Sequence, residues 1–188
     1  MRLNYSLLNF AKIENNFGII RGEDCCNMAK KSILKTNAMR YLDRKKLKYH
    51  VHQIELPDDF DATTVAEKLG VSPTSVYKTL VCKSEDDIAV AIIPAPNHLD
   101  LKKLAKIASK KSFAMLRHNE LKDIVGYIHG ACSPFAMKKD FPCFVDDSIL
   151  NENMVFVSAG KIGLQLELDA KDLINVRACT VCDLLLTD

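Results

Sequence analysis

Short apolar segments and capped amphipathic segments alternate along the chain from residue 36 onward. The continuous apolar runs 79–82 and 88–93 are joined through Asp86 and Asp87, which predicts a buried β-hairpin. The run 164–168 alternates apolar and polar residues cleanly, so we expect one face of this strand to meet water. The predicted strands are 49–54, 79–82, 88–93, 144–145, 154–157 and 164–168.

Helix starts are marked by side chains that can accept hydrogen bonds from the first free backbone N–H groups. Asp61 is such a residue, and the helix that it begins should end at Gly70. Ser72-Pro73 opens a short second helix with proline at its first position. The predicted helices are 38–46 after Thr36-Asn37, 62–69 after Asp61, a short helix from Pro73, a helix from Asp100 through Ser109, a helix at 119–125 and a short last helix after Asp169.

Strands and helices are interleaved, but several neighbouring strands are joined too tightly for crossover connections. This favours an α/β fold built on a compact mixed, partly antiparallel sheet that is curved or barrel-like and surrounded by helices. Neither a repeat nor a linker divides residues 31–188, so we expect one domain there. Residues 1–30 lack periodicity and are expected to be an N-terminal extension, with Met28 as a second candidate start.

The net charge is +2 over 188 residues, of which 48% are hydrophobic and 27% charged, as is typical of a globular domain. A nucleic-acid partner would therefore require positive residues gathered on one face. Two groups of basic residues could provide such a face, although solvated helix surfaces would give the same pattern. The first group is Lys30, Lys31, Lys35, Arg40, Arg44, Lys45, Lys46 and Lys48, and the second is Lys102, Lys103, Lys106, Lys110 and Lys111.

The chain is expected to be cytoplasmic. It has no apolar stretch of the length of a membrane helix, and its apolar start is interrupted by Asn4, Ser6 and Asn9. Seven cysteines without a secretion signal fit a reducing compartment. Cys179 and Cys182 have the spacing of half a zinc site or a redox pair, but no second pair completes it, so we interpret them as structural.

Candidate chemistry lies in two segments, because the phosphate-loop, nucleophile-elbow and HExxH motifs are missing from the sequence. In Val76–Leu80, Lys78 interrupts an apolar strand, where a cation can meet an anion or a developing oxyanion, or can simply extend to the surface. In Gly126–Pro134, two glycines and a proline indicate a rigid loop that closely approaches another group, or a tight turn.

Two arrangements of titratable residues are weaker candidates. Cys132 could act as a nucleophile with His129 as its base, although no orienting Asp or Asn is evident beside them. His50 and His52 share one face of a strand and supply at most two metal ligands, so we interpret them as a satisfied or exposed pair.

Three motifs follow one another along the chain: the segment Val76–Leu80, the GxxxP pattern of Gly130–Pro134, and Val157–Leu164 followed by Leu166-Glu167-Leu168. In this order they resemble the motifs of the YbaK-type Cys-tRNA(Pro) deacylases, whose wider family includes the editing domain inserted in bacterial prolyl-tRNA synthetases. The resemblance spans about Thr36 to the C-terminus. It implies a compact mixed α/β fold with a curved, barrel-like sheet.

The resemblance also implies the site residues. The expected catalytic residues are Lys78, Gly130 and Ala131, with loop amides facing the aminoacyl carbonyl. The expected substrate-binding residues are Tyr77, Cys132, Ser133, Pro134, Ser158, Gly160 and Lys161. Neither a cofactor nor a metal is implied.

The implied function is trans-acting removal of cysteine from mischarged tRNA(Pro), and by extension from tRNA(Cys), with the substrate's own thiol attacking its ester. The implied partners are aminoacylated tRNA(Pro) and prolyl-tRNA synthetase, with neither DNA nor a membrane involved. Two departures from the family pattern, Ile54 for an aromatic residue and Gln165 for an acidic one, leave the aminoacyl group open. The alternatives are a deacylase for Ala-tRNA(Pro) or another small aminoacyl-tRNA, and a non-catalytic RNA-binding module associated with a synthetase.

Overall fold

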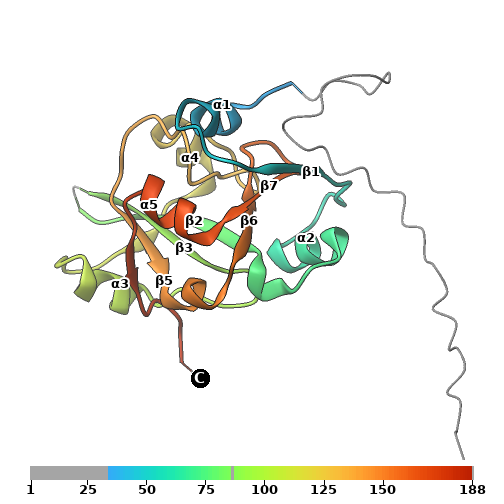
Figure 1. Cartoon of the computed structure of the whole chain (residues 1–188). Coiled ribbons are helices and arrows are strands. Elements are labelled where there is room, and N and C mark those ends of the chain that lie inside the picture. Colours follow the sequence, from blue (N-terminus) through green and yellow to red (C-terminus); the bar gives the residue numbers. More distant parts are fainter. Residues whose placement is uncertain (1–33, 86, 188) are drawn as a thin grey trace, which may run out of the picture.

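The computed structural model describes residues 34–85 and 87–187, which form a mixed α/β structure with five α-helices and two β-sheets (Figure 1). The fold class predicted from the sequence is thereby confirmed. The expected extension at 1–30, the basic residues Lys30 and Lys31, and the hairpin residue Asp86 lie outside the described residues.

The three-stranded sheet has the order β1-β7-β6 and is antiparallel throughout. The five-stranded sheet has the order β4-β2-β3-β5-β8, in which β2 and β3 form the predicted hairpin and β5 joins β3 and β8 in parallel. A parallel bridge between Val76 and Phe156 links the two sheets at the beginning of β2. The strands are β1 (His50–Gln53), β2 (Tyr77–Lys83), β3 (Ile88–Pro94), β4 (Ala114–Met115), β5 (Cys143–Asp146), β6 (Met154–Ser158), β7 (Leu164–Asp169) and β8 (Thr180–Cys182).

The helix caps follow the sequence signals. The side chains of Thr36, Asp61, Asp100 and Asp169 accept hydrogen bonds from the first turns of their helices, as predicted. Gly70 ends α2 in the left-handed region, with φ of 69°. The helices are α1 (Asn37–Arg44), α2 (Ala62–Leu69), α3 (Leu101–Ile107), α4 (His118–Ile124) and α5 (Ala170–Val176), with 3₁₀ turns η1 (Pro73–Ser75) and η2 (Asp147–Asn151). None of the described helices is long and apolar enough to cross a membrane.

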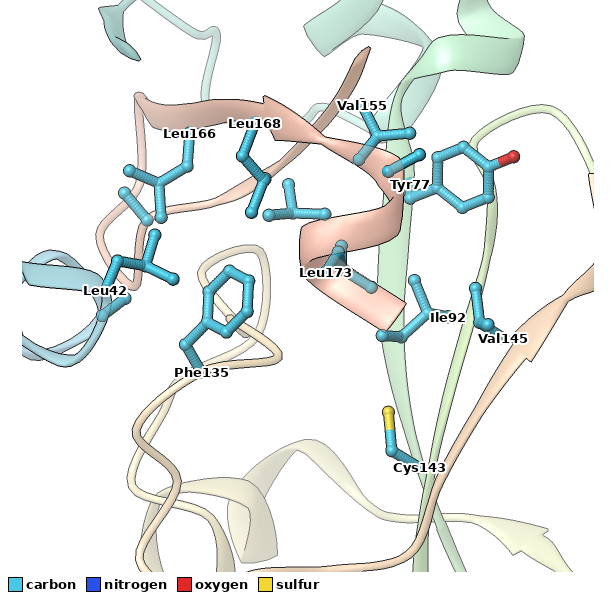
Figure 2. Packing of buried hydrophobic residues seen from close by; sticks show 14 of the residues in the cluster. Leu42, Tyr77, Ile92, Phe135, Cys143, Val145, Val155, Leu166, Leu168 and Leu173 are labelled. Atoms are coloured by element: carbon cyan, nitrogen blue, oxygen red, sulfur yellow. The ribbon is translucent and has the colours of Figure 1, made fainter. Parts of the chain in front are cut away.

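One large core joins the two sheets. Figure 2 shows Leu166 and Leu168 of β7 directed toward the region where Leu42 of α1 and Phe135 lie. The strands β2, β3 and β5 contribute side chains to the same cluster, and Leu173 brings in α5. Burial of this apolar surface holds the sheets together and fixes the ends of β2 and β6 beside each other.

The expectation that one face of the strand 164–168 meets water is wrong for Gln165. Gln165 is only 5% exposed. The reason is a second apolar cluster that covers this side of the smaller sheet and contains Phe156 together with Val65 of α2. Because Phe156 lies opposite Glu167 in the β6–β7 ladder, the polar positions of β7 lie on the side of this cluster, where only Glu167 keeps partial exposure, at 24% of its side chain.

Gly70 and Gly163 have similar positive φ angles but differ in the space around them, so a comparison of their alanine variants distinguishes backbone strain from steric clash. Gly70, with φ of 69°, has nothing within 4 Å of the position where a Cβ would lie. Gly163, with φ of 77°, would place a Cβ 2.6 Å from the carbonyl oxygen of Ile54, whose N–H donates to the Gly163 carbonyl. We predict that Gly70→Ala lowers the free energy of unfolding by about 1 kcal/mol and that Gly163→Ala lowers it by clearly more. Urea unfolding of both variants measures this, and equal losses would contradict the close approach of β1 to the β6–β7 turn.

Candidate active site

Lys78 lies on β2, on the opposite side of the strand from Tyr77. Its side chain is partly buried, and Nζ donates a hydrogen bond to the carbonyl oxygen of Ala95 at 2.8 Å. Ala95 directly follows β3, and its N–H donates to the Val76 carbonyl at 2.7 Å. The open end of the hairpin therefore positions the ammonium group.

Asp61 carries a negative charge that acts on Lys78, although the two described side chains form no ion pair. Burial lowers the pKa of Lys78, and the negative charge of Asp61 partly opposes that shift. Hydrogen bonds from Thr64 and Thr63 lower the pKa of Asp61 to about 2, so this carboxyl is ionised at neutral pH. The cap of α2 thus also supplies the counter-charge for a partly desolvated lysine.

Phe60 connects the Asp61 cap to the Gly130–Pro134 loop. Gly130 has φ of 76°, and a Cβ there would lie 2.9 Å from Cζ of Phe60. Only glycine allows both this backbone conformation and this close approach of the ring. Phe60 and Val65 belong to the same apolar cluster and flank the Asp61 cap as a hydrophobic staple.

Tyr127 connects the same loop to the turn after β6. A Cβ on Gly160, whose φ is 89°, would lie 2.7 Å from Cε1 of Tyr127. The Tyr127 hydroxyl donates to the carbonyl of Phe135 at 2.6 Å, and burial raises its pKa to about 12. Within the turn, the Ser158 hydroxyl accepts from the Gly160 N–H at 3.2 Å. Through Tyr127, the Gly130–Pro134 loop (the glycine loop) is linked to the turn of Ser158, Gly160 and Lys161 (the Ser-x-Gly-Lys turn).

The amides of the loop are not equally available to a ligand. The Ala131 N–H donates to the Ile128 carbonyl at 3.1 Å, so it is already used within the loop. Among the described residues, the N–H groups of Gly130, Cys132 and Ser133 have no hydrogen-bond acceptor, but Ser133 is 0% exposed. The amides of Gly130 and Cys132, and not that of Ala131, are therefore the donors that a ligand can reach. Ser133 and Pro134 are buried, which makes this part of the loop rigid.

Two predicted site residues are placed apart from this group. Tyr77 is 2% exposed and packs in the main core, with its hydroxyl 3.3 Å from that of Ser148. Because neighbouring residues of a strand point to opposite faces, Tyr77 cannot share a pocket with Lys78. Lys161 is exposed at the rim of the turn, and no interaction of its side chain with another described residue is seen.

The other candidate groups make contacts of a different kind. Burial raises the pKa of the Cys132 thiol to about 12, so it is neutral near pH 7. His129 stacks on His118 with ring centroids 3.8 Å apart. The Sγ of Cys179 lies 3.1 Å from the Sγ of Cys143, a partner on the neighbouring parallel strand, while Cys182 contacts the Thr180 carbonyl.

The two departures from the family pattern lie beside the Ser-x-Gly-Lys turn. Gln165 is opposite Ser158 in the β6–β7 ladder and opposite His52 in the β1–β7 ladder, so these three side chains share one face. His52 Nε2 is 2.7 Å from Glu167 Oε2, two residues further along β7. Ile54 approaches the turn through its backbone hydrogen bond to Gly163 at 2.8 Å.

The contacts of Phe60, Asp61 and Tyr127 in this site are not evident from the sequence. The sequence pattern identifies Asp61 only as a helix cap. An aromatic residue directly before such a cap is the pattern of a hydrophobic staple, which could have drawn attention to Phe60. Nothing local indicates that Tyr127 packs on Gly160, because 33 residues separate them along the chain.

Comparison with known proteins agrees with these features. Residues 57–176 match the family described as "Aminoacyl-tRNA editing domain". An Enterococcus faecalis protein, EbsC, named provisionally as a Cys-tRNA(Pro)/Cys-tRNA(Cys) deacylase, is 39% identical over 149 residues, which are 78% of this chain and 91% of that protein. An uncharacterised Bacillus subtilis protein, YwhH, is 30% identical over 115 residues, which are 57% of this chain and 69% of that protein.

A solved structure shares the fold. It is described as a candidate trans-editing enzyme for prolyl tRNA synthetase, with a TM-score of 0.71 and 22% identity, and the match covers 82% of this chain and 100% of that one. The family match covers more than half of the chain and contains Lys78, the glycine loop and the Ser-x-Gly-Lys turn. The chain belongs to the family of aminoacyl-tRNA editing domains, which are deacylases of misacylated tRNA.

Proposed function

We propose that this protein is a trans-acting deacylase that removes cysteine from mischarged tRNA(Pro). The observation that carries the proposal is the combination of a partly buried lysine with a rigid glycine loop whose one thiol, Cys132, is neutral. Such a site can bind and polarise an ester but offers no activated nucleophile in the loop. The name of the Enterococcus relative supports cysteine as the amino acid removed.

In the proposed reaction, the cysteine on the tRNA supplies the nucleophile. Its sulfur forms a bond to its own ester carbonyl carbon, and the ester C–O bond then breaks. The thiol proton passes to the departing ribose oxygen, which leaves free tRNA and a cyclic thiolactone. Water opens the thiolactone to cysteine in a later step. The amides of Gly130 and Cys132 would hold the carbonyl oxygen as it becomes negative.

Lys78 has the geometry to anchor the substrate during this step. An ammonium group carries three N–H donors, and the Ala95 carbonyl accepts one of them. The remaining donors can bind ribose or phosphate oxygens at the 3′ end of the tRNA. Holding the ester and the thiol in one reactive conformation is itself a large source of rate acceleration.

The test is a panel of substrates that differ only at the amino acid. Cys-tRNA(Pro) should be cleaved at least ~100-fold faster than Ser-tRNA(Pro), because a thiolate is a far better nucleophile than a hydroxyl near neutral pH. S-methylcysteinyl-tRNA(Pro) should bind competitively without being cleaved. Deacylation measured with radiolabelled amino acids gives both results. Rapid cleavage of the seryl or S-methyl substrate would show that water is the nucleophile.

The same substrate panel, extended to Ala-tRNA(Pro), tests the alternative that the protein deacylates a different small aminoacyl-tRNA. Gln165 and Ile54 stand where the cysteine-specific enzymes carry acidic and aromatic residues, which is the observation that favours a different small aminoacyl group. Faster cleavage of Ala-tRNA(Pro) than of Cys-tRNA(Pro) would assign the chain to that hydrolytic activity. Addition of prolyl-tRNA synthetase to the assay tests the proposed partnership, since a productive complex should lower KM.

Cys132→Ala should retain activity within about threefold, because the proposed donor at this position is the backbone amide and not the side chain. The matched control is Cys182→Ala on β8, outside the loop. Steady-state deacylation together with intact-protein mass spectrometry makes the measurement. A loss of several orders of magnitude in Cys132→Ala alone, with an acyl group trapped on Cys132 of the wild type, would replace this mechanism with covalent catalysis.

A further inference from the structure

A basic hollow lies on the surface between α1 and the segment that follows the glycine loop. It has a volume of about 390 Å³. We propose that this hollow binds the phosphate backbone of the RNA duplex next to the aminoacylated 3′ end. The inference deepens the proposed function, because it names the surface that holds the tRNA while its 3′ end is at Lys78.

The lining of the hollow is strongly positive. Four cations contribute to it, whereas the net charge of the whole chain is only +2. Asp140 is the one carboxylate of the lining, and it is paired with Arg177 at 3.2 Å. The lining residues are Asn37, Arg40, Tyr41, Arg44, Ala136, Met137, Lys138, Lys139 and Asp140.

These cations are available to a ligand. Within the part of the chain that the structure describes, Arg44 and Lys139 form neither an ion pair nor a side-chain hydrogen bond. Arg40 donates to the neutral side chain of Asn37, and Lys138 donates to the backbone carbonyl of Asp123. Phosphate oxygens can therefore replace solvent at these positions without breaking a salt bridge.

The second basic group seen in the sequence differs in this respect. Lys103 on α3 pairs with Asp183 at 2.8 Å, and Lys110 pairs with Asp87. Part of its charge is therefore compensated within the protein. The structure thus favours the hollow beside α1 over the surface of α3 as the face that meets RNA.

The hollow is connected to the proposed site by direct packing. Tyr41 in its lining stacks on Phe135, with ring centroids 6.0 Å apart. The carbonyl of Phe135 accepts the hydrogen bond from Tyr127, which packs against Gly160. A duplex backbone in the hollow would therefore lie directly beside the loop that receives the 3′ end.

A neighbouring hollow of about 540 Å³ shares Lys138 and Lys139 but does not extend the positive track. Its lining includes the carboxylates of Glu85, Asp87 and Asp123. These charges repel phosphate, so the RNA backbone should follow the α1 side.

The test compares two double variants with the same change of charge. Arg44→Gln/Lys139→Gln removes two exposed cations of the hollow, and the control Lys102→Gln/Lys106→Gln removes two exposed cations of α3. Both variants have the same net charge, so any loss of long-range electrostatic attraction between the protein and the RNA affects them equally. Binding is measured by fluorescence anisotropy over a series of salt concentrations. The ligand is an RNA hairpin that reproduces the acceptor arm of tRNA(Pro) and carries no amino acid.

The hollow variant should bind the hairpin at least ~10-fold more weakly at low salt, and its slope of log Kd against log salt should fall by roughly two. The control should remain within about twofold of the wild type, with an unchanged slope. Equal effects in the two variants, or no effect in the hollow variant, would overturn the assignment.

The outcome is separable from that of the proposed function, because the hairpin carries no amino acid. If the hollow binds the hairpin but the protein deacylates no aminoacyl-tRNA, the RNA-binding surface is supported and the proposed deacylase function is refuted. Conversely, if the hollow variant deacylates Cys-tRNA(Pro) with an unchanged KM, the RNA-binding surface is refuted and the proposed deacylase function is supported. If both hold, the variant should show a raised KM and a kcat close to that of the wild type.

Discussion

The partial burial of one positive charge is the constraint on which the site depends. Lys78 stands at the beginning of an apolar hairpin, where removing its ammonium group from water disfavours the charged form. The hydrogen bond to the Ala95 carbonyl and the negative charge of Asp61 offset part of this cost. Since Asp61 also caps α2, the position of that helix and the charge of the lysine are linked. A cation held in this way is preorganised for oxygen atoms of a substrate.

The glycines of the two loop motifs are explained by aromatic rings that lie against them. Phe60 occupies the space where a side chain of Gly130 would be, and Tyr127 occupies that of Gly160. Each ring also connects its glycine to another part of the site, Phe60 through its neighbour Asp61 and Tyr127 through the Phe135 carbonyl. Substitution of either glycine would therefore displace the ring as well as strain the loop. These contacts make one rigid unit of segments that are far apart along the chain.

The sequence was sufficient wherever the determining interaction is local. The caps Asp61, Asp100 and Asp169 and the β2–β3 hairpin depend on residues within one turn or one loop, and all were predicted. The exclusion of Tyr77 from the site could have been anticipated as well, because strand neighbours point to opposite faces.

Long-range pairings were beyond the sequence. The pairing of β1 with β7 joins segments more than a hundred residues apart, and it is this pairing that places Gln165 beside His52. Burial of Gln165 further depends on α2 covering the sheet, and the contact of Cys179 with Cys143 depends on the parallel pairing of β5 and β8. None of these leaves a periodic or local signal.

The most direct test of the account is Lys78→Met, which keeps most of the length of the side chain and removes its charge. The pKa of Lys78 in the folded protein lies below the ordinary value of 10.5, so at neutral pH its charge lowers the stability of the fold. The wild type gains stability relative to the variant only as the pH rises from the folded pKa toward 10.5. Deacylation of Cys-tRNA(Pro) and urea unfolding are measured on both proteins at neutral pH. The account predicts that kcat/KM falls at least ~100-fold while the free energy of unfolding does not decrease. Near-normal deacylation by the variant, or a loss of activity that merely follows unfolding, would contradict it.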